Sequence, residues 1–162
     1  MVNNAGVGGE TPFEAIKLEM FDRMIAVNLK ALFQLAQLAA PAMRARGWGR
    51  IINIASQLAY KGSAGLAHYC AAKAGIIAFT RSLSHEIGTS NITANCVAPG
   101  ATQTKMVEGL DKHLMESLVA SIPKGRLATV DEIVPAYVFL ASEEARHFVG
   151  QCLSPNGGDV ML

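Results

Sequence analysis

Two kinds of hydrophobic pattern alternate along the chain. Short apolar runs predict strands buried on both faces, whereas apolar residues spaced three and four positions apart predict helices. The strand-like runs are residues 50–55, 92–98 and 149–154. The helix-like segments are residues 13–46, 66–87 and 131–141. Residues 1–6 have the pattern of a strand end followed by a turn.

Proline and glycine support these boundaries. Pro12 suits the first turn of a helix, and Gly47 and Gly88 stand where two helices should end. The segment 13–46 should contain two helices with a break near residues 18–20. Because strands alternate with helices, we expect an α/β fold with a doubly wound parallel sheet, and 162 residues suit one domain.

Charge and composition limit the partners. The net charge is +1 without long charged runs, which gives no support for nucleic acid or an acidic membrane as partner. No signal sequence or membrane-length apolar run is recognisable, so we expect a cytoplasmic protein without a membrane partner. Cys70, Cys96 and Cys152 lack CxxC spacing and are expected to be reduced. The four histidines lack metal-ligand spacing, so no metal site is expected.

One tyrosine and one lysine form the strongest candidate for chemistry. Tyr69 and Lys73 are four residues apart, which places them on one face of a predicted helix. Ser56 comes directly after a predicted strand, at the sheet edge where ligands bind in doubly wound folds. Such a Tyr–Lys pair is common by chance, and the alternative is an ordinary amphipathic pair with a solvated lysine.

The order and spacing of six short motifs resemble those of the short-chain dehydrogenase/reductase family, closest to 3-oxoacyl-acyl-carrier-protein reductases. The motifs are the Asn-Asn-Ala-Gly of residues 3–6, Asn28, Ser56, the Tyr69–Lys73 pair, Pro99-Gly100 and the Asn-Gly-Gly of residues 156–158. The resemblance covers essentially the whole chain. It implies a Rossmann-like sheet, NAD or NADP as cofactor, a small carbonyl or alcohol substrate, and assembly into a homo-dimer or homo-tetramer.

The resemblance also implies roles for four catalytic residues. Tyr69 would be the general acid or base, and Ser56 would hold the substrate oxygen. Lys73 would lower the pKa of Tyr69, which is ordinarily about 10, and would hold the nicotinamide ribose. Asn28 would anchor a water that leads protons to the lysine; without the resemblance it would be read as a helical residue facing solvent.

Further residues resemble the family's cofactor contacts. They are Asn4, Ala5, Gly6, Tyr69, Lys73, Pro99, Gly100, Thr102 and Thr104. Residues 105–127 have the apolar character of a lid over the substrate, partly through Leu110 and Leu114. This hints at an apolar ketone or an acyl thioester as substrate.

The family's glycine-rich phosphate-binding loop is not recognisable in the sequence. The nearest stretch, residues 6–9, follows the Asn-Asn-Ala-Gly turn and lacks the required spacing. We therefore expect residues 1–162 to form a single incomplete domain, truncated at its N-terminus. It would lack the first three strands, or roughly 75–90 residues at about 30 per βαβ unit. Such a chain should expose a sheet edge and bind cofactor poorly.

Two other functions remain open at this point. The chain could be a catalytically dead relative that serves as a binding or assembly partner, although its complete Ser–Tyr–Lys set favours an enzyme. It could also be an unrelated hydrolase that uses Ser56, but no Gly-x-Ser-x-Gly turn surrounds this serine.

Overall fold

The computed structural model describes residues 1–109 and 111–161, and its centre is a parallel sheet. The strands are β1 (Val2–Asn3), β2 (Gly49–Ile54), β3 (Ile92–Val97) and β4 (Cys152–Leu153), and they lie in this order across the sheet. All three strand pairs are parallel, and Asn3, Asn53, Cys96 and Cys152 lie side by side in one row. The predicted α/β class with a parallel sheet is confirmed.

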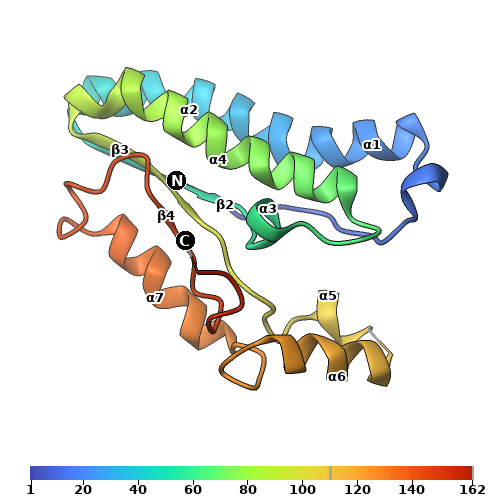
Figure 1. The fold of residues 1–162 in the computed structure, drawn as a ribbon. Coiled ribbons are helices and arrows are strands. Elements are labelled where there is room, and N and C mark those ends of the chain that lie inside the picture. The colour runs from blue at the N-terminus through green and yellow to red at the C-terminus, as the bar shows by residue number, and fades with distance from the viewer. Residues whose placement is uncertain (110, 162) are drawn as a thin grey trace.

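Helices cover both faces of the sheet (Figure 1). One face carries α1 (Leu18–Ile25), the π-helical turn η2 (Ala26–Lys30), α2 (Ala31–Arg46) and α4 (Ala67–Ile87). The opposite face carries α7 (Val130–Ala141). Short 3-10 turns, η1 (Phe13–Ala15) and η3 (Gly88–Ser90), precede α1 and follow α4.

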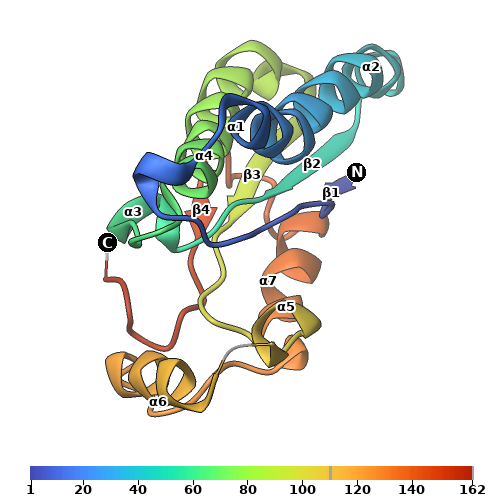
Figure 2. The same cartoon turned by 90° about the vertical axis from the view of Figure 1, so that its right-hand side faces the viewer.

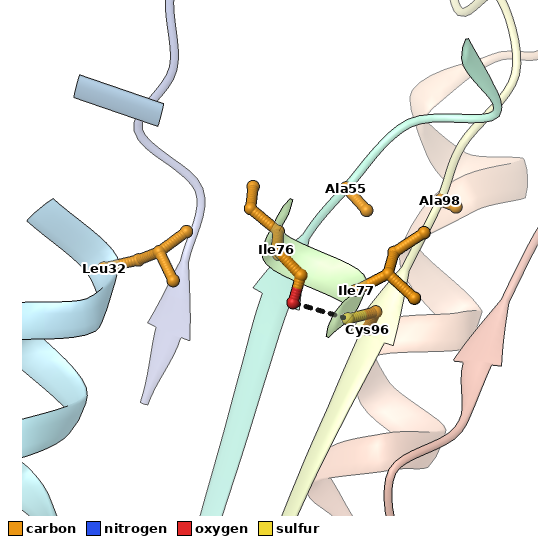
Figure 3. Packing of buried hydrophobic residues seen from close by; sticks show 6 residues of the cluster. All are labelled: Leu32, Ala55, Ile76, Ile77, Cys96 and Ala98. Atoms are coloured by element: carbon orange, nitrogen blue, oxygen red, sulfur yellow. Dashed lines mark hydrogen bonds between the residues drawn. The ribbon is translucent and has the colours of Figure 1, made fainter. Parts of the chain in front are cut away.

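Apolar side chains fill the space on both sides of the sheet. On the α4 side, Ile76 and Ile77 of that helix pack with Leu32, Ala55 and Cys96 (Figure 3). On the α7 side, a separate cluster joins Ile52, Val97, Leu140 and Ala145. Because both faces are covered, β2 and β3 are buried along nearly their whole length, which explains their unbroken apolar runs.

Three elements differ from the sequence-based prediction. The break in segment 13–46 falls at Ile16–Lys17, and from Leu18 one unbroken helix runs to Arg46 through the π-turn. A short helix, α3 (Leu58–Lys61), lies where only a loop was expected. Strand β4 has two residues instead of the six predicted, although Gly150 N still donates to Ala94 O at 2.9 Å.

Two short helices, α5 (Lys105–Glu108) and α6 (Lys112–Ser121), lie beyond the carboxyl ends of the strands (Figure 2). They form the segment that was predicted as a lid. Leu110, which was expected to contribute to its apolar character, is outside the described residues.

One helix among the described residues is long and apolar enough to cross a membrane by length and composition alone. It is the continuous helix Leu18–Arg46, whose most apolar window has a mean hydropathy of 1.2. The expectation that no run reaches this length was therefore wrong. A core helix of a globular domain meets the same criterion. In this helix Leu32, Ala36 and Met43 are buried beside the sheet, while only 22% of the apolar window is buried.

Candidate active site

A groove of about 400 Å³ lies at the carboxyl ends of the strands. The segments after β1, β2 and β3 meet there with α4 and η2, as expected for a doubly wound sheet. The residues that line the groove are Asn4, Gly6, Val7, Asn28, Ile54, Ala55, Ser56, Tyr69, Lys73, Pro99, Gly100, Thr104 and Lys105. The groove thus brings together all four predicted catalytic residues.

Ser56, Tyr69 and Lys73 face this groove from two elements. Ser56 follows β2, and its Oγ accepts a hydrogen bond from Leu58 N at 3.2 Å. The first two turns of α4 carry Tyr69 and Lys73, and the Lys73 ammonium lies 5.6 Å from the centre of the Tyr69 ring. Lys73 is 4% exposed, and its Nζ donates to Ile54 O at 2.8 Å. The alternative of a solvated lysine is therefore wrong.

Burial controls the ionisation of this pair. Burial raises the pKa of Tyr69, and a hydrogen bond with Ser56 opposes this rise. Burial also lowers the pKa of Lys73 to about 8. Burial is the largest cause of both shifts, and the lowering of the Tyr69 pKa by Lys73 stays a prediction.

Asn28 is fully buried in the π-helical turn, so the alternative of a solvent-facing side chain is wrong. Its amide Nδ2 donates to Val7 O at 3.0 Å, and its Oδ1 accepts from Val7 N at 3.2 Å. Nδ2 also donates to Met24 O at 3.1 Å. The side chain therefore fastens the turn after β1 to the helix and lies at the wall of the groove.

Two of the three residues predicted in the turn after β1 lie at the groove. Asn4 and Gly6 line the groove, whereas Ala5 does not. A Cβ at Gly6 would lie 2.8 Å from Asn28 Oδ1 and 3.6 Å from Lys73 Nζ. Glycine is needed here because a larger residue would collide with Asn28 Oδ1.

The loop after β3 separates the groove from a second pocket. Pro99, Gly100 and Thr104 line both hollows, whereas Thr102 lines only the second pocket and donates from Oγ1 to Gly100 O at 3.0 Å. A Cβ at Gly100 would lie 2.7 Å from Asn156 Cα. This glycine therefore permits close packing of the loops that follow β3 and β4.

The second pocket, of about 360 Å³, also opens onto Ser56 and Tyr69. Much of its wall is apolar, from Leu58, Leu66, Val107, Leu114 and Leu118. A pocket of this size and character is typical of small-molecule sites. Its position beside both hydroxyls makes it the candidate substrate pocket.

Three polar residues of this region were missed by the sequence analysis. Asp159 Oδ2 accepts from Gln57 Nε2 at 2.6 Å, and Lys61 Nζ donates to both carboxylate oxygens of Asp159. Gln57 and Lys61 line the substrate pocket. The position of Gln57 directly after Ser56 was the available signal, but the contact with Asp159 joins residues about a hundred positions apart.

Comparisons with known proteins agree with this geometry. A family model described as enoyl-(acyl carrier protein) reductase matches residues 1–159. The chain is 43% identical to nodulation protein G of Azospirillum brasilense, over 98% of this chain and 64% of that protein. It is 41% identical to the 3-oxoacyl-acyl-carrier-protein reductase of Rickettsia felis, over 100% of this chain and 67% of that protein.

A solved structure of similar fold is the gluconate 5-dehydrogenase of Burkholderia cenocepacia in complex with NADP and tartrate. It has a TM-score of 0.94 and 34% identity, over 97% of this chain and 62% of that one. The chain thus spans about two thirds of the length of these relatives. Fold and comparisons together define a Rossmann-like α/β fold. Within that class, the chain belongs to the short-chain dehydrogenase/reductase family.

Proposed function

We propose that the protein transfers hydride between a nicotinamide cofactor and a small carbonyl or alcohol, with Tyr69 as general acid or base. The observation that carries this proposal is the meeting of Ser56, Tyr69 and Lys73 at one groove that adjoins an apolar pocket. The relatives' names include reductases and dehydrogenases, which supports the same reaction class.

The contacts of Ser56 and Tyr69 suit them to hold and protonate one oxygen. Ser56 Oγ accepts from Leu58 N, and its hydroxyl hydrogen can turn from Tyr69 to a carbonyl oxygen in the pocket. The Tyr69 hydroxyl donates its proton to the same oxygen during reduction and removes it during oxidation. The two donors also stabilise negative charge that develops on this oxygen.

The geometry of Lys73 would allow its ammonium to hold the nicotinamide ribose. An ammonium has three donors, and one is used by Ile54 O. The remaining donors are available in the groove for the hydroxyls of a nicotinamide ribose and for a water that leads toward Asn28. A positive nicotinamide ring beside Tyr69 would favour its phenolate, which opposes the effect of burial on its pKa.

NAD or NADP fits the groove. Asn4 and Gly6 line the groove, so a cofactor can lie along the turn after β1. Asn4, Gly6, Tyr69, Lys73, Pro99, Gly100 and Thr104 would hold the cofactor, which supplies or accepts the hydride when bound. Ala5 and Thr102 lie outside the groove lining and would support the residues that hold the cofactor.

We further propose that residues 1–162 alone bind this cofactor weakly and turn over slowly. These residues supply contacts for the nicotinamide half, but their sequence contains no glycine-rich loop that could hold the pyrophosphate. A chain that also carries the family's first three strands should bind the cofactor more tightly and turn over faster.

The substrate is proposed to be an apolar ketone or acyl thioester, because leucine and valine side chains form much of the pocket wall. Homo-oligomers are proposed from the family resemblance, and exposed apolar side chains such as Phe33, Leu35 and Leu38 of α2 support association. The alternative of a non-catalytic assembly partner keeps the same surface but requires no turnover.

The test is a turnover assay on a chimera. The N-terminal third of the Rickettsia felis reductase would be joined before Met1, and cofactor oxidation would be followed with a 3-oxoacyl thioester. A polar ketone of the size of oxidised gluconate would be the comparison substrate. Turnover that prefers the thioester supports the proposal, preference for the polar ketone contradicts the substrate class, and a folded chimera inactive on both favours the assembly partner.

A further inference from the structure

Two of the three cysteines lie side by side in the sheet. Cys96 of β3 and Cys152 of β4 are direct partners in the parallel register. Neighbouring strands are about 4.7–4.9 Å apart, which is within the roughly 4.4–6.8 Å that a disulfide requires between Cα atoms. The backbones at these two positions therefore already have a spacing that a disulfide can bridge.

Both thiols belong to the same side of the sheet. Cys96 is part of the apolar cluster beneath α4, and Cys152 packs against that cluster (Figure 3 shows Cys96 among its neighbours). Cys96 Sγ donates to Thr80 Oγ1 at 3.0 Å and is 1% exposed. Cys152 is only partly buried, in contrast to Cys96.

The surroundings of the two thiols shift their pKa values in opposite directions. The interaction with the Cys96 thiol lowers the pKa of Cys152, and the hydroxyl of Tyr60 acts in the same direction. The interaction with Cys152 and burial raise the pKa of Cys96. Cys152 is thus the sulfur that ionises first, and the thiolate is the nucleophile in thiol oxidation.

We propose that Cys96 and Cys152 are a redox-sensitive pair that closes to a reversible disulfide when the protein meets a peroxide. The Cys152 thiolate attacks one peroxide oxygen, an S–O bond forms, the O–O bond breaks, and the leaving hydroxide takes a proton to become water. Cys96 then attacks the Cys152 sulfur, the S–S bond forms and the S–O bond breaks, and the leaving hydroxide takes the proton of the Cys96 thiol to become a second water. Two thiols lose two electrons, and one hydrogen peroxide is reduced to two waters.

The disulfide would act on the wall between groove and pocket. Strand β3 leads directly into Pro99-Gly100, and β4 leads into Ser154 and Asn156. These two segments already touch, because Ala98 N donates to Leu153 O at 2.7 Å and Gly100 N donates to Pro155 O at 3.0 Å. A covalent link a few residues earlier in both strands would hold these two segments together and restrict their movement.

The test is oxidation of the 162-residue chain with a small excess of hydrogen peroxide, followed by mass spectrometry. We expect the loss of two hydrogen atoms, a linked peptide pair that contains Cys96 and Cys152, and full reversal by dithiothreitol. The melting temperature should rise on the order of 5–15 °C on oxidation, because the link closes a long loop in the unfolded chain.

The third cysteine supplies a matched control. Cys70→Ser should leave the oxidation product and the melting shift unchanged, whereas Cys152→Ser should abolish both. If Cys152→Ser fails to fold, the peptide map of the wild-type chain still decides. Sulfenic or sulfonic acid at Cys152 without a link, or disulfides through Cys70, would overturn the proposal. Links that appear only in denaturant would overturn it as well, since the folded sheet must place the pair.

Discussion

At the scale of the residue, the positions of the candidate catalytic residues were predictable and the effect of burial on their pKa values was not. Helical periodicity places Tyr69 and Lys73 on one face, and Ser56 follows a recognisable buried strand. The burial of Lys73 and its bond to Ile54 O depend on how α4 packs on β2, which sequence spacing does not encode. For the same reason, the contact of Gln57 and Lys61 with Asp159 was missed.

Lys73 should carry a measurable cost in stability. A pKa lowered from 10.5 to about 8 corresponds to about 3 kcal/mol at neutral pH. The folded protein holds this proton less tightly than the unfolded chain. The cost is therefore full below pH 8 and disappears as the pH rises toward 10.5.

Lys73→Met should consequently raise the free energy of unfolding by about 1–3 kcal/mol at pH 7, and this gain should shrink at pH 10. Urea unfolding of both proteins at the two pH values measures the effect. Lys17→Met, at an exposed position, is the control and should show no such pH-dependent gain. A gain that is equal at both pH values would contradict the proposed cost of the buried charge.

At the scale of the element, the sequence predicted the long helices but neither the π-turn within the longest one nor the short helix α3. The turn η2 places Asn28 against the backbone of Val7, and this tertiary contact decides the local geometry. Helix α3 was missed because Leu58–Lys61 is a single short turn without periodicity. Strand β4 was predicted too long because only Cys152 and Leu153 pair in register with β3.

The close approach at Gly6 gives a test of this junction. Gly6→Ala should displace the Asn28 amide, because the new Cβ would lie 2.8 Å from Oδ1. We expect a loss of about 1–3 kcal/mol in the free energy of unfolding. Gly109→Ala is the matched control, since nothing lies within 4 Å of a Cβ there. Equal stability of the two variants would contradict the fastening role of Asn28.

At the scale of the whole molecule, the alternation of strands and helices was sufficient to predict the fold class. The strands of the parallel sheet bring their carboxyl ends to one edge, so segments distant in sequence meet at the groove. The expected edge strand is β1, and Val2 on it is 52% exposed. Oligomeric state and cofactor choice depend on surfaces and residues that the pattern does not reveal.

The 162-residue chain should have a low affinity for the nicotinamide cofactor. The 162-residue chain should bind NADH and NADPH at least tenfold more weakly than the chimera, because its residues contact mainly the nicotinamide half. Titration of cofactor fluorescence measures both dissociation constants. Equal affinity would show that these 162 residues are sufficient for binding.

The central claim is that Tyr69 is the proton donor at the groove, and one substitution tests it most directly. In the chimera with a 3-oxoacyl thioester, Tyr69→Phe should lower kcat by about 10²–10⁴-fold while leaving the dissociation constant of the cofactor nearly unchanged. Tyr137→Phe, on α7 and outside the lining of groove and pocket, should retain full turnover. Turnover of Tyr69→Phe within a factor of about three of the unmodified chimera would contradict the claim.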